Sequence, residues 1–297
     1  MKTPRAFRET CIKNFFLLTA CISILVLTLI MAFLFIQGMP IFKTVPVTDF
    51  LFGSNWYPTS EPPDFGILPL IAASLAVTFV SSLMAIPLGV MTAIYLAEIC
   101  SRRARNIVKP IVELLAALPS VVIGFFGMVI VAPFLQDYFD LDTGLNLFNA
   151  SIMLAFMSIP TICTVSEDAI YAVPGELKEA SLGLGATHWQ TIAKVILPAS
   201  LSGISTAVIL GMSRAIGETM VVLMVAGGAA LIPLSIFDPV RPMPASIAAE
   251  MAEAPFQSDH YYALFATGMV LFIFTLIFNM VAEHIAHKHK QTGAATL

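Results

Sequence analysis

Two opposite charges, Arg214 and Glu218, interrupt the apolar run LGMSRAIGETMVVLMVAGG at residues 210–228. A spacing of four residues predicts that both side chains project from one helix face, about 6 Å apart along its axis. A guanidinium stays charged and presents a planar fork of donors that fits phosphate-like oxyanions, and a nearby carboxylate can neutralise it while no anion is bound. The pattern therefore indicates either an anion site or a structural ion pair that holds two helices in register.

The elements that carry these charges are predicted to be membrane helices. Of the 297 residues, 58% are hydrophobic and 11% are charged, whereas an ordinary soluble domain has about a quarter charged residues. Hydropathy predicts an all-α integral membrane protein with six transmembrane helices, near residues 15–37, 68–97, 108–135, 149–171, 195–232 and 260–283. A charge at the centre of a span costs about 2.5–3.5 kcal/mol if it faces lipid. We therefore expect Arg214 and Glu218 to face protein or a watery passage.

The distribution of Lys and Arg sets the expected orientation of these spans. Twelve of them lie in the N-terminal segment, the second-to-third and fourth-to-fifth connections and the C-terminal tail. The three loops on the other side contain only two, Lys43 and Arg241. Because cytoplasmic loops carry the excess of basic residues, both termini are expected in the cytoplasm.

Prolines interrupt several of the predicted spans, at positions 87, 119, 160 and 198. Proline removes a backbone donor and clashes with the preceding turn, and in lipid the freed carbonyl needs another partner. Each of them can be a simple structural kink. Pro119 differs because Ser120, Gly124 and Gly127 follow it, and small residues let backbones approach or expose polar backbone to a passage. We therefore include Pro119 and Ser120 among the candidate pathway residues.

The connection between the fourth and fifth spans, VPGELKEASLGLGATHWQTIAKVILPAS, predicts a helix–turn–helix at the cytoplasmic face. Residues 176–182 have a helix-forming composition, Gly183 and Gly185 interrupt them, and a second periodic segment begins at Trp189. The apolar side chains of this helix–turn–helix need a partner surface, either lipid headgroups or another protein. They are Leu177, Leu182, Trp189 and Ile192. The chain has no G-x-x-x-x-G-K-[ST] phosphate loop, so we expect any energy source to lie on another chain.

This connection resembles the EAA motif of ABC-importer permeases. Glu179-Ala180-Ser181, then Gly185, then Val195-Ile196-Leu197-Pro198 match the spacing of that motif, with Ser181 and Val195 as mild departures. The resemblance implies a coupling helix that docks into a groove of a separate ATP-hydrolysing subunit, which binds ATP and magnesium. Glu179 and Ala180 would engage that subunit, Gly185 would make the turn, and Leu197 and Pro198 would close the motif.

Four more segments resemble the phosphate-specific ABC importer permeases, of the PstC type rather than the PstA type: FGILPLIAASLAVTF, IPLGVMTAIYLAE, LAALPSVVIGFFG and RAIGETMVVLMVAGG. The similarity runs from about Phe65 to the last span. It implies a type I importer permease fold in the bacterial inner membrane, with no enzymatic activity and no cofactor on this chain. The implied partners are a homologous second permease, an ATP-binding subunit dimer, a soluble phosphate-binding protein and inorganic phosphate, and no nucleic acid. It also places Arg214 and Glu218 in the translocation region.

The resemblance divides the chain into three parts. Residues 1–67 hold a cytoplasmic segment, a retained anchor helix and an extracytoplasmic loop, residues 68–285 form the permease core with its coupling loop at 172–194, and residues 286–297 form a cytoplasmic tail. The histidines at positions 284, 287 and 289 are interpreted as part of a basic, solvated tail, with no metal site. The loops FLFGSNWYPTSEPPDFG and FDPVRPMPASIAAEMAEAP, the second with a short helix, either receive the binding protein or merely cap the helices.

Other functions stay open at this point. An importer of sulfate or molybdate is disfavoured by the GET and PSVVIGF segments, a secondary transporter by the EAA loop, and a membrane scaffold by the mid-span charges. The chain can also be the other permease subunit of the same importer. Glu218 can have a second role, because it can accept a hydrogen bond from the proton that phosphate still carries at neutral pH, whereas fully ionised sulfate has no such proton.

Overall fold

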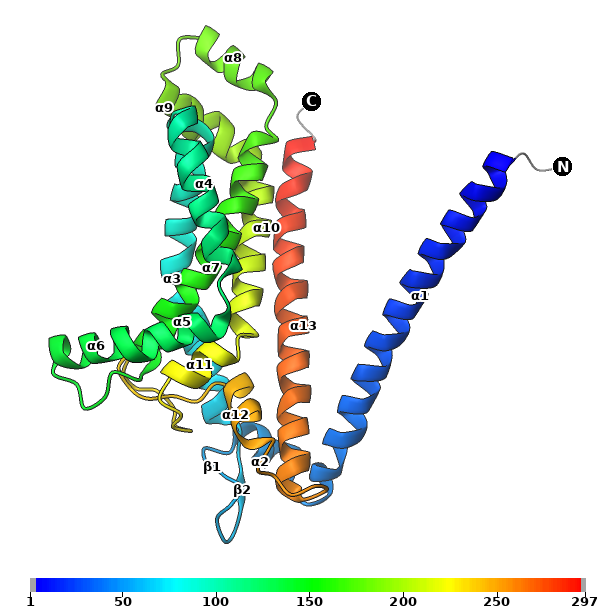
Figure 1. Cartoon of the computed structure of the whole chain (residues 1–297), viewed down its shortest axis with the longest axis vertical. Helices are drawn as coiled ribbons and strands as arrows, with labels where there is room; N and C mark the ends of the chain where they lie inside the picture. Colours follow the sequence, from blue (N-terminus) through cyan, green and yellow to red (C-terminus); the bar gives the residue numbers. More distant parts are fainter. Residues whose placement is uncertain (1–3, 295–297) are drawn as a thin grey trace.

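The computed structural model describes the backbone of residues 4–294 and the side chains of residues 8–281, 283 and 284. The described chain is mainly helical, as predicted, with one two-stranded sheet. Six of its helices are long and apolar enough to cross a membrane. The longest of them lie lengthwise in the molecule, between an end formed by α8 and α9 (the α8 end) and an end formed by α2 and α12 (the α12 end; Figure 1). These four elements span Gly175–Gly183, His188–Thr191, Val47–Phe52 and Met243–Glu250, respectively.

Three helices form the centre of the bundle: α3 (Leu68–Ile94), α7 (Leu147–Tyr171) and α10 (Leu197–Ile216). They meet at Ile162 of α7, which lies between two glycines. A Cβ added to Gly89 of α3 would lie 2.8 Å from Ile162 Cγ2, and one added to Gly211 of α10 would lie 2.5 Å from Ile162 Cγ1. In lipid, helices associate through close packing of small residues rather than through hydrophobic burial. The glycines therefore fix how closely these backbones approach.

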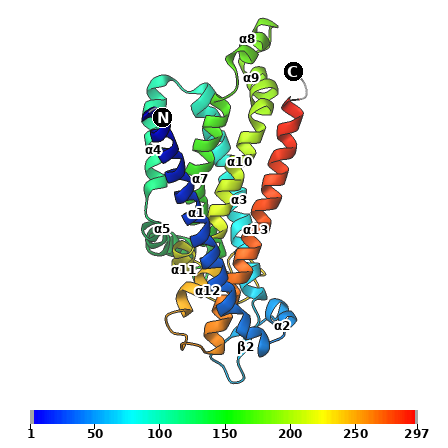
Figure 2. The ribbon, with the colours of Figure 1, turned by 90° about the vertical axis from the view of Figure 1, so that its right-hand side faces the viewer.

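The first and last predicted spans are confirmed as α1 (Pro4–Gly38) and α13 (Asp259–Ala294). These helices touch near the α12 end, where Phe33 packs edge-on against Phe265 and a Cβ on Gly38 would lie 2.3 Å from Met269 Sδ. A 3-10 turn, η1 (Met39–Lys43), follows α1. Toward the α8 end α1 diverges from the bundle, and its most apolar stretch is not buried within this chain (Figures 1 and 2). Lipid or another subunit must cover that stretch.

The third predicted span, 108–135, is wrong as a single helix. α4 (Arg102–Ala117) ends before Leu118, and three short elements follow: α5 (Ser120–Phe126), the π-helical segment η3 (Gly127–Val131) and α6 (Ala132–Phe139). Leu118 is extended, with φ −65° and ψ 132°, because the proline that follows disfavours the helical conformation of the residue before it. Figures 1 and 2 show α4 running along the bundle, whereas α5 and α6 turn across it.

The fifth predicted span, 195–232, is also wrong at both ends. α10 ends at Ile216, and a separate short helix, α11 (Met220–Val225), follows Gly217. On the other side the helix begins earlier than predicted, because α9 continues through the π-helical segment η4 (Ile192–Ile196) into α10. Pro198 therefore lies in the first turn of α10 without opening the membrane helix.

The segments η3 and η4 share a cause. Each lies directly before a helix whose second residue is a proline, Pro133 in α6 and Pro198 in α10. Since proline cannot donate to the carbonyl four residues earlier, the local turn widens to the i→i−5 pattern. Accordingly, the Ala132 N–H donates to the Gly127 carbonyl and the Leu197 N–H donates to the Ile192 carbonyl. A third π-helical segment, η2 (Tyr95–Ile99), ends α3.

At the α12 end the connections fold into a compact cap. β1 (Trp56–Tyr57) pairs antiparallel with β2 (Asp64–Phe65), with Trp56 opposite Phe65. The cap has its own apolar core, whose fully buried large side chains are Ile41, Phe50, Trp56, Ile67, Leu70 and Met243. The predicted short helix between the fifth and sixth spans is confirmed as α12.

Candidate functional site

Arg214 and Glu218 lie on either side of a helix break. Arg214 occupies the last turn of α10, Gly217 ends that helix with φ −88° and ψ 0°, and Glu218 precedes α11. The expectation that both charges project from one continuous helix is therefore wrong, because glycine at this position ends the helix. Among the described residues no ion pair joins the two side chains. The structural ion pair that the spacing allowed is not formed within this chain.

Each of these charges has the sign that its helix end favours. A cation is stabilised near the negative C-terminal end of a helix and an anion near the positive N-terminal end. Glu218 Oε1 also accepts a hydrogen bond from the Val221 N–H at 3.4 Å, in the first turn of α11. The helix break thus makes a local place for two opposite charges inside an apolar sequence.

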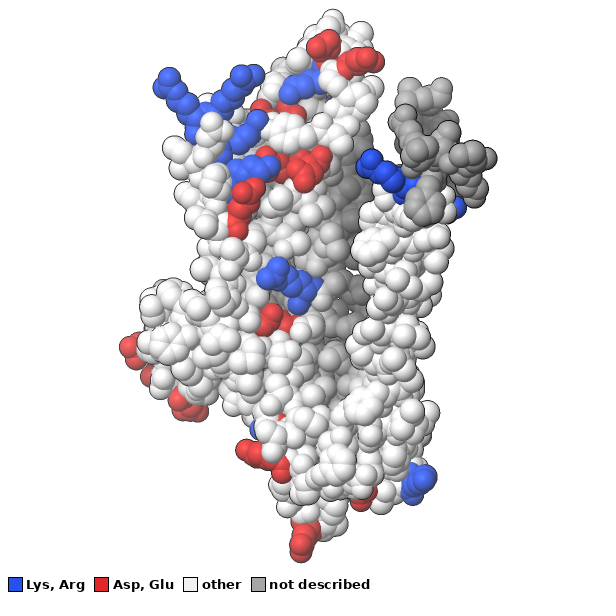
Figure 3. Space-filling view, turned by 45° about the vertical axis from the view of Figure 1, so that its right-hand side comes forward, with Lys and Arg blue, Asp and Glu red and all other residues white. Residues whose placement is uncertain are grey.

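The Arg214 side chain is exposed in this chain, and Glu218 is half-buried. Arg214 lies about 25 Å along the helix from Leu197, at 1.5 Å per residue. On the face shown in Figure 3, charged side chains gather toward the two ends, and one basic and one acidic group lie between them on an otherwise uncharged surface. Arg214 lies within the fifth candidate membrane span, where lipid contact is costly for a guanidinium. Arg214 must therefore meet water or another subunit.

The small residues around Arg214 serve contacts inside this chain. Gly211 packs on Ile162, the Ser213 hydroxyl donates to Asn279 Oδ1 of α13, and Ala215 is buried. Gly217, at the break, is the exposed one among them. Small residues can let a neighbouring subunit come close, but the space beside the first three is already occupied by this chain's own helices.

Pro119 and Ser120 begin α5, which packs against α11. A Cβ on Gly124 would lie 2.9 Å from Met224 Sδ and 3.3 Å from Val221 Cα, so these two short helices are in close contact. The structure thus brings the segment after Pro119 and the segment after Glu218 together through apolar packing. Pro119 itself is exposed and Ser120 half-buried, and no hydrogen bond or ion pair joins either to Arg214 or Glu218 among the described residues.

The predicted helix–turn–helix is confirmed at the α8 end. Lys178 and Ser181 form the half-buried face of α8, whereas Glu179, Ala180 and Leu182 are exposed. The exposed apolar residues include Leu184, at 89% exposure, and Trp189, at 66%. The prediction for Ile192 is wrong: this residue packs into the chain's own core and is 1% exposed. An exposed face with carboxylate and apolar groups remains.

The turn between α8 and α9 depends on Gly185. Its φ of +83° lies in the region that favours glycine. The N–H groups of Gly185 and Ala186 bond to the carbonyls of Leu182 and Ser181 at 3.0 and 3.2 Å, which satisfies the end of α8. α9 then opens with a capping box between Thr187 and Gln190. Leu197 is half-buried and Pro198 exposed at the start of α10.

A second set of charges at the α8 end was not singled out by the sequence. Glu98, at the end of α3, pairs with Lys178 of α8. Glu167 of α7 is 1% exposed and pairs with Lys109 of α4 at 3.1 Å. These residues lie at the margins of apolar runs, where charge is ordinary, so spacing alone does not distinguish them from solvated ends.

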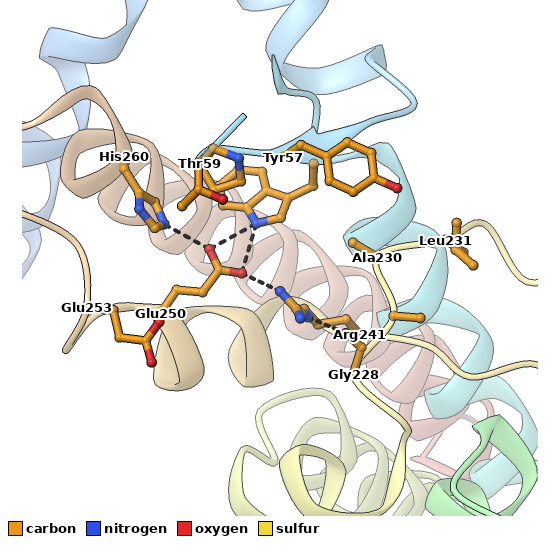
Figure 4. Close-up of a pocket in the computed structure, with 12 residues that line it drawn as sticks. Tyr57, Thr59, Gly228, Ala230, Leu231, Arg241, Glu250, Glu253 and His260 are labelled. Carbon is orange, nitrogen blue, oxygen red and sulfur yellow. Dashed lines mark hydrogen bonds and ion pairs between the residues drawn. The ribbon is translucent and has the colours of Figure 1, made fainter. Parts of the chain in front are cut away.

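A cavity of about 470 Å³ opens at the α12 end around the Glu250 carboxylate (Figure 4). The Trp56 indole N–H donates to both carboxylate oxygens, at 3.0 and 3.1 Å, and His260 Nε2 lies 2.8 Å from Oε2. Arg241 forms an ion pair with Oε1, and its Nε donates to the Gly228 carbonyl at 2.7 Å. This carboxylate therefore ties β1, the loop before α12, α12 itself and the start of α13 together. These residues are far apart in the sequence, and no motif or spacing indicated that they would lie together.

The histidine-containing tail at 286–297 lies outside the residues whose side chains the structure describes. Within the described part of the chain no group of three or more His, Cys, Asp or Glu residues is arranged to hold a metal ion.

Comparison with known proteins gives consistent matches. Residues 85–291 match the family described as binding-protein-dependent transport system inner membrane component. The chain is 36% identical to the probable ABC transporter permease protein YqgH of Bacillus subtilis, over 94% of this chain and 92% of that protein. It is 35% identical to the phosphate transport system permease protein PstC of Mesorhizobium japonicum, over 82% and 80% of the two chains. The PstC of Pasteurella multocida is 33% identical, over 91% and 88%.

Solved structures share the fold. A chain of a bacterial alginate ABC transporter, solved with its alginate-bound periplasmic protein, superposes with a TM-score of 0.67 at 17% identity, covering 97% of this chain and 98% of that one. A chain of the inward-facing MetNI methionine ABC transporter superposes with a TM-score of 0.61 at 22% identity, covering 78% and 99%. At such identities the likeness concerns the fold alone.

Proposed function

The chain belongs to the family of binding-protein-dependent transport system inner membrane components, and we propose that it carries inorganic phosphate through the membrane as one half of an importer's translocation pathway. It is a permease subunit of an ABC importer and a multi-pass protein of the inner membrane, with no enzymatic role. Such permeases work with a separate ATPase subunit, which binds the nucleotide, and with a substrate-binding protein.

The observation that carries the proposal is the exposed guanidinium of Arg214 at the break between α10 and α11. A homologous second permease would cover this face, and the anion would pass between the two subunits. There the Arg214 donors, which form no hydrogen bond or ion pair among the described residues, can bind two oxygens of an oxyanion at once. Pro119 and Ser120 would border the same passage through the contact of α5 with α11.

Phosphate is the substrate that the neighbouring carboxylate favours. Inorganic phosphate at neutral pH exists partly as the monohydrogen and partly as the dihydrogen anion, and each form has at least one O–H that can donate a hydrogen bond to a carboxylate oxygen. Glu218 has one oxygen on the Val221 N–H and a second that no described donor occupies. Two relatives named as phosphate transport permeases, at 35% and 33% identity, support the same substrate.

The exposed face of α8 would dock on the ATPase subunit dimer. Glu179 and Ala180 lie on that face, Gly185 sets the turn behind it, and Leu197 with Pro198 begins the membrane helix that the loop would drive. ATP and magnesium would be bound wholly by the partner. The α8 end would then lie in the cytoplasm, together with the start of α1 and the end of α13 (Figure 1). This orientation agrees with the distribution of Lys and Arg. The α12 end would then receive the soluble phosphate-binding protein.

The test is uptake by the assembled importer in proteoliposomes, with labelled phosphate in competition with unlabelled sulfate, molybdate or arsenate. We expect arsenate, which carries a proton as phosphate does, to compete, and sulfate and molybdate not to. Arg214→Gln should abolish uptake while assembly and ATP hydrolysis stay measurable, whereas Arg103→Gln, an exposed arginine at the α8 end, should leave uptake unchanged. Uptake that survives Arg214→Gln contradicts the pathway assignment. Strong competition by sulfate or molybdate favours the alternative, a related oxyanion importer.

A further inference from the structure

The coupling helix α8 stands away from the bundle. No side chain of Gly175–Gly183 is buried, and Figures 1 and 2 show α8 at the extreme end of the molecule. Its flanking glycines are unconfined, since a Cβ at Gly175, Gly183 or Gly185 would have no neighbour within 4 Å. Apolar packing therefore does not hold α8 in one orientation. A force applied to α8 could therefore rotate this helix about its ends without moving the membrane helices.

Among the described residues, one ion pair joins α8 to a membrane helix. Lys178 Nζ forms an ion pair with Glu98 Oε2, at the end of α3. The same oxygen lies 3.9 Å from Nε2 of His188, the first residue of α9. A neutral hydrogen bond between the hydroxyls of Ser181 and Thr191, at 3.0 Å, joins α8 to α9 at the start of the fifth membrane helix. One carboxylate oxygen thus faces both arms of the helix–turn–helix.

Glu98 itself is held firmly. Its side chain is 9% exposed, and the two preceding residues, Leu96 and Ala97, are buried in the apolar core at this end. The carbonyls of these two residues accept hydrogen bonds from the Arg105 guanidinium, with 2.7 Å from Nε to Leu96 and 2.9 Å from Nη2 to Ala97. Arg105 also stacks over the ring of Tyr171 in α7, 4.9 Å from its centroid. The end of α3 is therefore fixed to α4 and α7.

We propose that Glu98 is a positioning residue that ties the coupling helix to α3, so that displacement of α8 by the ATPase moves the α3 end instead of pivoting the loop. The proposal rests on the proposed docking of α8 on the ATPase. The register of α8 supports it: Lys178 pairs with Glu98 of the bundle, whereas Glu179, one residue later, is exposed on the proposed docking face. One helix turn can therefore hold the partner with one face and the membrane helix with the other.

The experiment uses the full importer in proteoliposomes and compares phosphate imported with ATP hydrolysed. Glu98→Gln and Lys178→Gln should each retain the ATPase subunit and hydrolyse ATP within about twofold of the unmodified importer. The phosphate moved per ATP should fall at least fivefold in both variants. Glu113→Gln and Lys194→Gln, exposed residues of α4 and η4, are the matched controls and should not change this ratio.

A reversed pair separates positioning from a general need for charge. Glu98→Lys combined with Lys178→Glu restores the attraction with opposite polarity and should recover at least half of the phosphate moved per ATP, whereas each reversal alone should not. An unchanged ratio in Lys178→Gln, which lies on the unpacked helix and leaves the bundle intact, overturns the proposal, as does failure of the reversed pair to recover. Loss of the ATPase from the unmodified importer would contradict the proposed function instead.

Discussion

Gly211 of α10 packs directly against Ile162 of α7, one helix turn before Arg214. The same Ile162 side chain, 1% exposed, also touches Gly89 of α3, so it is held between the two glycines. The position of the candidate anion-binding guanidinium is therefore set by how closely three backbones approach one buried isoleucine. Packing in the centre of the bundle and the geometry of the pathway are linked at this contact.

We expect Gly211→Ala to destabilise the protein by about 1–3 kcal/mol, the usual cost of an extra methyl group in a tight core. The added Cβ would lie 2.5 Å from Ile162 Cγ1. Thermal unfolding in detergent measures the loss, and Ile162→Ala in the same protein should recover part of it. Gly183→Ala is the control, because its Cβ meets nothing within 4 Å. Equal unfolding temperatures for the two alanine variants would contradict the packing described here.

The number of apolar helices could be predicted from the sequence, because apolar runs of about 20 residues have few other uses. The helix–turn–helix at the α8 end was also predicted, from Gly183, Gly185 and the periodicity around them. These features depend on local composition. They require no knowledge of what packs against what.

The breaks in the third and fifth spans could not be placed from hydropathy. The runs around Pro119 and Gly217 stay apolar through the break, since α5 and α11 pack on each other and not on water. An average of residue hydropathy indicates that a segment is apolar, but it does not indicate where the helix ends or changes direction. A glycine three residues after an arginine is a C-terminal helix signal that indicates the second break, and the apolar residues after it concealed that signal.

Long-range polar contacts are the other part of the site that the sequence did not predict. Trp56 and Glu250 are 194 positions apart, and Glu98 and Lys178 are 80 positions apart. Each is an ordinary residue in its local context. Only the fold brings each pair together, so their roles follow from the tertiary structure.

Glu250→Gln should loosen the cap at the α12 end. The change removes the negative charge that Arg241, His260 and Trp56 share, and loss of one partner of a largely buried ion pair costs a few kcal/mol. Because the Arg241 side chain is 29% exposed, we expect a smaller loss of about 1–3 kcal/mol in the free energy of unfolding. Trp56 and Trp189 are the two tryptophans, so Trp189→Phe leaves Trp56 as the reporter.

In the Trp189→Phe background, the fluorescence of Trp56 should change with Glu250→Gln, because its indole N–H loses a charged acceptor. Glu253→Gln, an exposed carboxylate at the rim of the same cavity, should leave both the emission and the unfolding temperature unchanged. An identical emission spectrum in the two glutamine variants would show that the Trp56–Glu250 contact is not formed.

Gly185→Ala should weaken binding of the ATPase subunit more than it affects the fold of the bundle. A β-carbon disfavours the φ of +83° by about 1 kcal/mol, which would reorient α8 relative to α9. Co-purification of the ATPase with this variant should fall about fivefold. Gly185→Asn, which tolerates such a φ better, should retain more of it, and Gly175→Ala should retain all of it. Full retention by Gly185→Ala would mean that the turn does not position the docking face.

Glu218→Gln tests how the pathway would distinguish phosphate from sulfate. The glutamine oxygen can still accept from the Val221 N–H, so the start of α11 should keep its conformation. The amide has no charge, however, and its nitrogen cannot accept a hydrogen bond from the phosphate O–H. We expect phosphate uptake to fall at least tenfold, about 1.4 kcal/mol in transition-state free energy, while sulfate becomes a stronger competitor. Glu283→Gln, at the far end of α13, should change neither. Equal loss of phosphate and sulfate binding would mean that Glu218 only balances the charge of Arg214 and does not distinguish protonated from fully ionised anions.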